Sequence, residues 1–335
     1  MLRLPRFQLL EPRTVEEALA ALASYGDRAR IMAGGTDLVP NMKHELETPE
    51  VVISLRGIES LRGVAEEAHA VRIGPLTTLH DLSHHPIVHR FFPSLADACA
   101  EVAGPQLRRM GTIGGNVCLD TRCVYVNQTY FWRQALGFCL KKDGTVCHVV
   151  SGGRRCVAAA SNDSGPVLMS LGATLELANS ERTRTSTIED FYVQDGVFNQ
   201  QRARDELLVG ITIPKPKPRT VMAYQKLRTR AAIDFPELGV AVLAELSEVG
   251  LAERVDICLT ALASRPVRVS KLEAVYKDRE LDAETILALG RSAFDRAKPL
   301  TNIATDADYR REMVTVMVKR AFATALGRPP SFAER

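Results

Sequence analysis

Five of the seven cysteines in this 335-residue chain fall between residues 118 and 156, where an even distribution would place about one. The same segment has no sustained helical or strand periodicity, and a stretch of this length without regular elements is uncommon inside a domain unless something organises it. The cysteine count is odd and the chain does not begin like a signal peptide, so we do not expect structural disulfides. A metal centre held by thiolates would organise the segment.

The four cysteines Cys123, Cys139, Cys147 and Cys156 lie 16, 8 and 9 residues apart. Four thiolates suit either a tetrahedral zinc ion or a [4Fe–4S] cube. Zinc ribbons usually present their ligands in close CxxC pairs, which this segment lacks. The wide spacing therefore favours the cube, although zinc and a loop with free thiols both remain open.

Basic residues surround these cysteines, with one acid, Asp143, among them. They would offset the negative charge of a thiolate-bound cluster, or they would form a docking face for an acidic electron donor. Both interpretations remain open. The basic residues are Arg122, Arg133, Lys141, Lys142, Arg154 and Arg155.

The composition of the whole chain excludes some classes of function. With 43 basic and 40 acidic residues, the net charge of +3 gives no electrostatic reason to expect a nucleic-acid partner. No apolar run approaches the roughly 18 residues that a membrane span requires, so we expect no membrane partner and a cytoplasmic protein.

The order of segments predicts an α+β chain in two parts. Three prolines between Pro214 and Pro218 mark a linker, so we expect one domain over residues 1–215 and a second over residues 216–335. Helices are predicted at 14–26, 77–85, 93–103, 270–278, 283–297 and 308–327, and strands at 29–32, 51–55, 70–76, 166–178, 206–214, 221–230, 238–246 and 255–262.

Two glycine pairs, Gly34–Gly35 and Gly114–Gly115, each follow an apolar approach and predict tight turns. Adjacent glycines also let backbone N–H groups approach a phosphate oxygen, so two such loops together could hold a pyrophosphate. Neither pair fits the GxGxxG of a Rossmann site or the GxxxxGK[ST] of a P-loop. Ordinary turns and a different dinucleotide site both remain possible.

A series of motifs in fixed order is more specific than either glycine pair. AGGTDLVPNMK, GPQLRRMGTIGGN, NDS before LMSLGATLEL, DELLVGITIP and YQKLRTRAAID follow one another along the chain. From about residue 5 onward, this series resembles the FAD-binding subunits of the xanthine dehydrogenase family of molybdenum hydroxylases. The resemblance implies a PCMH-type FAD-binding domain in two α+β subdomains, then a smaller α+β domain typical of carbon monoxide dehydrogenase flavoproteins.

The resemblance also implies which residues contact FAD. In the first loop the amides of Gly34, Gly35 and Thr36 would meet the pyrophosphate, and Asp163, Leu208 and Lys226 would make later contacts. By itself, Lys226 would be interpreted as a solvated surface residue. The two loops comprise Ile31, Met32, Ala33, Gly34, Gly35, Thr36, Asp37 and Leu38, and then Thr112, Ile113, Gly114, Gly115 and Asn116.

The segment at about 118–158 lies as an insertion between two of these FAD elements, Asn116 and Asp163. Its motifs TRC, FCLKKDGTVCHV and GGRRC resemble a branch of the family whose flavin subunit carries an extra [4Fe–4S] cluster. On that basis Cys123, Cys139, Cys147 and Cys156 are the ligands. Cys118 competes for the first position, but we expect it to pack beneath the second glycine loop.

That branch implies an oxidoreductase subunit which reduces an aromatic CoA ester with electrons from a ferredoxin. Its partners would be a large subunit with the molybdenum cofactor and a small subunit with two [2Fe–2S] clusters, in a dimer of heterotrimers. Two alternatives remain: a hydroxylase-type flavin subunit that passes electrons outward, and a structural zinc loop. We expect Tyr130, Phe131 and Trp132 to form the apolar shell of the insertion.

Overall fold

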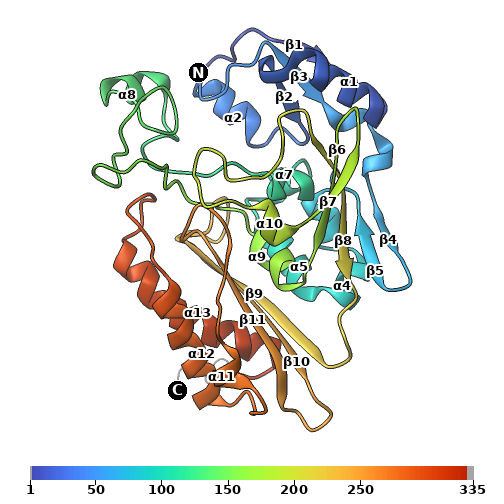
Figure 1. Ribbon diagram of the computed structural model, residues 1–335, viewed down its shortest axis with the longest axis vertical. Helices are drawn as coiled ribbons and strands as arrows, with labels where there is room; N and C mark the ends of the chain where they lie inside the picture. The colour runs from blue at the N-terminus through green and yellow to red at the C-terminus, as the bar shows by residue number, and fades with distance from the viewer. Residues whose placement is uncertain (1, 330–335) are drawn as a thin grey trace.

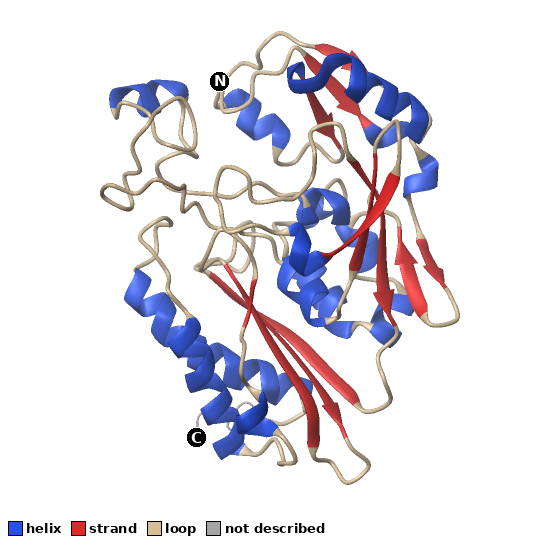
Figure 2. Cartoon of the chain, viewed as in Figure 1, coloured by secondary structure: helices blue, strands red, loops and turns tan. Residues whose placement is uncertain are grey.

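The computed structural model describes residues 2–329, so the outermost residues of the two predicted domains, 1 and 330–335, lie outside the described part. Three sheets with helices packed on them form the molecule, and a segment that is green in Figure 1 projects from it at α8 (Figures 1 and 2). No helix within residues 2–329 is both long and apolar enough to cross a membrane. The fold is α+β, as predicted.

The first sheet is parallel and has the strand order β1-β3-β2. Helix α1 packs on it, and Thr14 caps that helix by accepting the N–H of Glu17 at 3.2 Å, as the sequence predicts. This small sheet positions the first glycine loop, which follows its strand β2. The elements are β1 (Gln8–Leu10), α1 (Val15–Tyr25), β2 (Ala29–Met32), α2 (Leu38–Lys43) and β3 (Val51–Ser54), with short 3-10 helices at Gly26–Arg28, Leu55–Gly57 and Glu59–Leu61.

The second sheet has five antiparallel strands in the order β4-β5-β8-β6-β7. Its last strand in sequence, β8, lies in the middle, and short helices bury its inner face. The elements are β4 (Val64–Glu66), β5 (Ala70–Ile73), α3 (Leu79–Leu82), α4 (Pro86–Phe91), α5 (Pro93–Glu101), α6 (Pro105–Arg108), α7 (Ile113–Val117), α8 (Tyr130–Ala135), α9 (Ser164–Ser170), β6 (Thr174–Ala178), β7 (Thr183–Thr187), α10 (Ile188–Phe191) and β8 (Leu207–Pro214).

The third sheet is antiparallel, with the order β12-β11-β10-β9, and it begins after the predicted linker. Helices α12 and α13 cover one of its faces (Figure 1). The elements are β9 (Thr220–Leu227), β10 (Leu238–Leu246), β11 (Ala252–Thr260), β12 (Val267–Arg268), α11 (Glu273–Tyr276), α12 (Ala283–Arg296) and α13 (Ala307–Ala325).

Strand β10 explains how the two parts of the molecule are joined. Its alternate residues Val240 and Val242 pack in the core under α12 and α13, whereas Ala241 and Leu243 pack in the core of the preceding domain. Side chains of a strand alternate between the two faces, so both faces of this sheet are buried. This double burial accounts for the nearly continuous apolar run LGVAVLAEL.

The prediction of one strand over 166–178 is wrong in its first half. Residues Ser164–Ser170 form α9, and only Thr174–Ala178 form a strand. All seven residues of α9 are buried, so the helix has no polar face and its sequence shows no helical periodicity. A short apolar run of this kind cannot be assigned from its pattern.

Candidate cofactor sites

The first glycine loop joins β2 to α2. Gly35 has φ +73°, a conformation that side-chain-bearing residues rarely adopt, and a Cβ on Gly34 would lie 1.9 Å from the carbonyl oxygen of Met110. Within residues 2–329, the N–H groups of Gly34, Gly35 and Thr36 donate to no protein acceptor. Three unused backbone donors in one loop are the arrangement that binds a phosphate oxygen.

The second glycine pair lies inside α7, so the tight turn predicted there is wrong. Thr112 caps this helix by accepting the N–H of Gly115 at 3.1 Å. Gly114 donates to the carbonyl of Pro75 at 2.8 Å, and a Cβ on Gly114 would lie 2.6 Å from the Pro75 side chain. Gly114 is thus required by close packing within the protein, whereas a Cβ on Gly115 would meet only the Thr112 side chain, at 3.2 Å.

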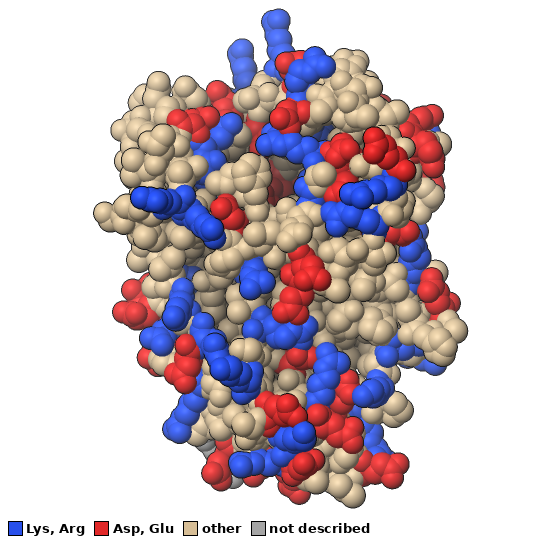
Figure 3. Space-filling model, viewed as in Figure 1, with Lys and Arg blue, Asp and Glu red and all other residues tan. Residues whose placement is uncertain are grey.

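The two loops lie side by side, as a shared pyrophosphate site requires. The Cβ position of Gly34 meets Met110, and the Cβ position of Gly111 lies 3.5 Å from Thr36 Oγ1. Residues 110–111 lead directly into the second loop. The surface is hollowed beside α2 and above α7 (Figure 3).

A hydrogen-bonded pair of residues closes the ends of the insertion. Ser164 donates its N–H and its hydroxyl to Asn116 Oδ1, at 3.1 and 2.6 Å. The second glycine loop and the start of α9 are therefore neighbours although the insertion separates them in sequence. Asp163, the residue before Ser164, occupies the N-cap position of α9.

Asp163 and Lys226 form an ion pair with side chains only 3% and 1% exposed. The Lys226 Nζ to Asp163 Oδ1 distance is 3.0 Å, and Lys226 also donates to the carbonyl of Glu101 at 2.9 Å. Tyr224 donates its hydroxyl to Asp163 Oδ1 at 2.7 Å. Lys226 is therefore not the solvated residue that its local sequence suggests.

Burial is the largest influence on the pKa values of Asp163 and Lys226. It raises the pKa of Asp163, while the Lys226 ammonium and the Tyr224 hydroxyl act in the opposite direction. Burial likewise lowers the pKa of Lys226, and Asp163 opposes that shift. Tyr224 was not among the residues predicted from the sequence, although it lies two residues from Lys226 and therefore on the same face of β9.

Leu208 lies in β8 opposite Leu177 and is buried in the main core.

Asp37 follows the two glycines of the first loop. Burial raises the pKa of Asp37, and the nearby guanidinium of Arg122 opposes part of that rise. Arg122 Nη1 donates to Asp37 Oδ1 at 3.1 Å, and its guanidinium lies 4.0 Å from the centre of the Phe235 ring. Arg122 thus joins the insertion to the first loop and to the C-terminal domain.

The insertion contains a single regular element, α8, and is otherwise loop (Figure 2). Arg133 on α8 is only 1% exposed; it pairs with Asp143 at 2.9 Å and donates to the carbonyl of Glu45 at 3.0 Å. On the other side, Val124 donates its N–H to the carbonyl of Asn302 at 2.9 Å. Polar contacts to both domains therefore hold the segment in place.

The four predicted ligands converge. Cys123, Cys139, Cys147 and Cys156 line one small cavity, together with apolar side chains and the stem of Lys141. Three of the thiols are nearly fully buried. Across residues 2–329, no three His, Cys, Asp or Glu side chains lie close enough to hold a single metal ion. The four thiols therefore surround a common cavity and do not meet around the position of a single metal ion.

Burial raises the pKa of Cys123 to about 11, and it raises the pKa of Cys156 as well. The N–H of Ala158 donates to Cys156 Sγ at 3.4 Å, the kind of contact that stabilises a thiolate. His148, the neighbour of Cys147, has its Nε2 2.6 Å from the carbonyl oxygen of Phe138.

The other three cysteines do not line this cavity. Cys99 and Cys258 are fully buried in the main core, and burial raises the pKa of both. Cys118 ends α7 and packs against the same core, so it lies beneath the second glycine loop as expected.

The prediction for the aromatic residues is wrong. Tyr130, Phe131 and Trp132 are 40%, 79% and 39% exposed, so they lie on the outside of the insertion and do not form its core. Cys123, Val126, Cys139, Cys156 and Ala158 form its small core instead.

Fold and loops together define a two-domain flavoprotein. Residues 5–216 match the family described as the FAD binding domain in molybdopterin dehydrogenase, and residues 222–325 match the CO dehydrogenase flavoprotein C-terminal domain. The chain belongs to the FAD-binding medium subunits of the xanthine and CO dehydrogenase, or molybdenum hydroxylase, family.

Curated relatives and a solved structure agree with this family. The carbon monoxide dehydrogenase medium chain of Afipia carboxidovorans is 31% identical over 96% of this chain and 97% of the relative. That of Hydrogenophaga pseudoflava is 29% identical over 97% of this chain and 98% of the relative. The carbon monoxide dehydrogenase structure from Hydrogenophaga pseudoflava, which lacks the Mo-pyranopterin moiety, matches with a TM-score of 0.80 and 29% identity, over 97% of this chain and 99% of that one.

Proposed function

We propose that this chain carries both FAD and a [4Fe–4S] cluster, and that it transfers electrons within a molybdenum enzyme complex. The observation that supports the cluster is the convergence of Cys123, Cys139, Cys147 and Cys156 on one cavity. Four thiolates approaching from different directions match the four irons of a cube.

For FAD, the two glycine loops supply the phosphate site. The unused amides of Gly34, Gly35 and Thr36 would bind the pyrophosphate, with Gly115 facing it from the second loop. Asp163 and Lys226 would complete the site, and Leu208 would make an apolar contact. The remaining proposed contacts are Ile31, Met32, Ala33, Asp37, Leu38, Thr112, Ile113, Gly114 and Asn116.

For the cluster, the apolar surroundings and the neighbouring cations supply what thiolate-bound iron needs. Burial limits the access of water, and N–H donors to sulfur adjust the potential of such a centre. When bound, the cluster would supply one-electron chemistry. The role of this chain is to bind and orient the group, to exclude water from it and to connect it to the FAD loop through Arg122.

We further propose that the complex resembles 4-hydroxybenzoyl-CoA reductase, which removes the phenolic hydroxyl of its substrate to give benzoyl-CoA. The chain would accept electrons from a ferredoxin and pass them toward partner subunits. Those partners would carry the molybdenum cofactor and two [2Fe–2S] clusters, in a dimer of heterotrimers. The support is the match of TRC, FCLKKDGTVCHV and GGRRC across the insertion.

We also propose the domain division at residue 215, with the insertion at about 118–158 as a separate module. The five residues 215–219 separate β8 from β9, and a distinct apolar core lies under α12 and α13.

The first experiment is to measure iron, acid-labile sulfide, zinc and flavin per chain on anaerobically purified protein. About four irons and four sulfides per flavin would support the proposed ligand set. One zinc per chain, with no sulfide and a flavin-only spectrum, would make the insertion a structural metal loop and would refute the cluster.

A second candidate is a flavin subunit of a hydroxylase, which passes electrons outward from FAD to an acceptor. The named relatives, carbon monoxide dehydrogenase medium chains, favour this direction more than they favour the reductase. Measuring flavin reduction in the whole complex distinguishes the two candidates. Rapid reduction of the flavin by reduced ferredoxin supports the reductase. Flavin that is reduced only through substrate oxidation at molybdenum supports the hydroxylase.

A further inference from the structure

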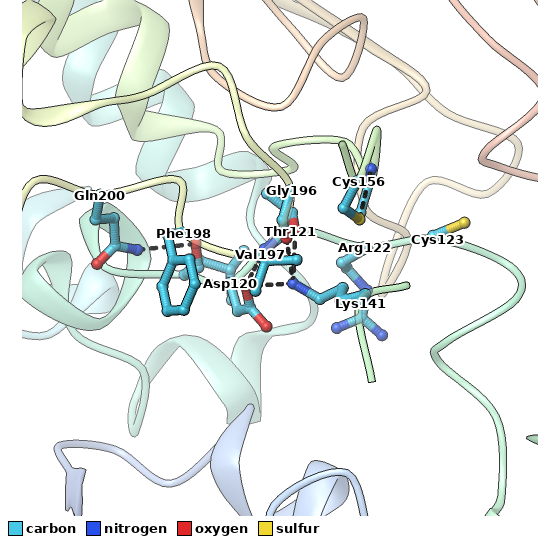
Figure 4. A network of polar contacts seen from close by, with 12 residues as sticks. Asp120, Thr121, Arg122, Cys123, Lys141, Cys156, Gly196, Val197, Phe198 and Gln200 are labelled. Atoms are coloured by element: carbon cyan, nitrogen blue, oxygen red, sulfur yellow. Dashed lines mark hydrogen bonds and ion pairs between the residues drawn. The ribbon is translucent and has the colours of Figure 1, made fainter. Parts of the chain in front are cut away.

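Lys141 has an unusual position for a lysine in a loop. Its side chain is 9% exposed, and its Nζ donates to Asp120 Oδ1, Thr121 Oγ1 and the carbonyl of Gly196, at 2.8, 2.8 and 2.6 Å (Figure 4). An ammonium group has three N–H donors, and all three are used here. The neighbouring Lys142 is 39% exposed and pairs only with Asp143.

The carbonyl of Gly196 is the centre of this network. It also accepts the hydroxyl of Thr121 at 2.6 Å, and the N–H of Gly196 donates to the carbonyl of Cys156 at 2.9 Å. A Cβ on Gly196 would lie 2.6 Å from Cys156 Sγ. The backbone at Gly196 therefore lies directly against a thiol of the four-cysteine cavity (Figure 4).

Lys141 connects all the segments that carry these cysteines. Lys141 itself lies between Cys139 and Cys147, in a turn where Leu140 donates its N–H to the carbonyl of Val146 at 2.8 Å. Its partner Thr121 precedes Cys123, and Arg122 exchanges two backbone hydrogen bonds of 2.8 Å with Ala159, just after Cys156. One buried side chain thus joins three separate stretches of the insertion to the 195–198 loop.

We infer that Lys141 is a positioning residue for the four-thiol site. It holds Gly196 against Cys156 and fixes the turn between Cys139 and Cys147 to the other two ligand segments. Its ammonium group is linked to the Cys156 segment through Gly196, which accepts from Lys141 and donates its N–H to the carbonyl of Cys156. The inference rests on the proposed function, because it assigns Lys141 a role toward the cluster proposed for that site.

Two consequences follow from this geometry. Without Lys141, the 195–198 loop loses its strongest attachment, because hydrogen bonds from a charged donor are stronger than neutral ones. A cluster bound by the four thiolates would also lose a nearby cation. Since reduction adds negative charge, removing that cation makes reduction less favourable and shifts the midpoint potential in the negative direction.

The test compares Lys141→Met with Lys142→Met, an adjacent and more exposed lysine outside this network. Amide hydrogen exchange on the iron-free chain measures the attachment without any cluster. We expect exchange of residues 195–198 to be at least about tenfold faster in Lys141→Met and unchanged in Lys142→Met. Equal exchange in the wild type and both variants would overturn the inference.

The second measurement is the midpoint potential of the iron–sulfur signal in the full-length protein, with Lys141→Arg as the conservative variant. A negative shift in Lys141→Met, absent in Lys142→Met and reduced in Lys141→Arg, is expected. An unchanged potential would refute the role toward the thiols. If the wild type contains no iron, the proposed cluster fails while hydrogen exchange still decides whether Lys141 holds the loop.

Discussion

The Nζ of Lys226 lies 3.0 Å from Oδ1 of Asp163, and the two side chains are almost completely shielded from water. Lys226 belongs to the C-terminal sheet and Asp163 to the start of α9, so the pair joins the two domains at the proposed FAD site. Removing one partner of such a buried pair is costly, because it leaves an uncompensated charge in a site that water does not reach.

Lys226→Met should lower stability by about 3–5 kcal/mol, because it leaves the Asp163 carboxylate buried without its partner. Bound FAD should fall in parallel. Thermal unfolding and flavin absorbance per chain measure the two effects. Lys217→Met removes a lysine that is 71% exposed, and it should leave the melting temperature nearly unchanged, because solvent screens its ion pair with Glu245. Equal melting temperatures for the two variants would argue against a structural ion pair.

Gly34→Ala should destabilise the protein by about 1–3 kcal/mol and abolish FAD binding, because its Cβ would push the Met110 carbonyl away. Gly115→Ala places a Cβ 3.2 Å from Thr112 Oγ1 and against no backbone, so the fold should tolerate it while FAD affinity drops. Flavin titration and thermal unfolding separate the two variants. Full flavin binding by Gly115→Ala would remove that residue from the proposed site.

Cys139→Ser should lose most iron and sulfide and keep its flavin, since the insertion is attached to the FAD domain by contacts that do not need this thiol. Cys118→Ser is the control, because Cys118 packs in the core and does not line the four-thiol cavity. Metal analysis and flavin absorbance on one anaerobic sample decide the question. If both variants retained full iron, the ligand assignment would be wrong.

Alkylation after iron removal should follow thiol burial. Cys147, the least buried of the four proposed ligands, should react first, whereas Cys99 and Cys258 should react only when the chain unfolds. Burial raises the pKa of both core thiols, so neither supplies thiolate at pH 8. Mass spectrometry of iodoacetamide-treated protein gives the order. Rapid labelling of Cys258 in folded protein would contradict this account.

Local sequence signals predicted much of the fold. Thr14 and Gly26 marked the ends of α1, and the apolar run of β10 marked a strand that is buried on both faces. The pattern failed at α9, because a helix buried on every side carries no periodicity. It also failed at Gly114, since a glycine required by packing on Pro75 looks like a glycine in a turn.

For the proposed sites, the candidate residues were predictable from the sequence, but their partners were not. The spacing of the cysteines and the order of the motifs identified the main candidates. Long-range partners were not predictable, because Lys141 meets Gly196 and Arg122 meets Asp37 only after folding. Phe131 was expected to be buried because it is aromatic, but it is exposed. The sequence does not show which face of the insertion is left open to solvent.

The hydrogen bonds from Ser164 to Asn116 have an evolutionary consequence. They join two residues that are 48 positions apart in sequence, and none of the described strands lies in the excursion between them. An ancestral gene could therefore acquire or delete the whole excursion in one event without re-pairing any sheet. The flavin scaffold and the cysteine-bearing segment would then have separate histories.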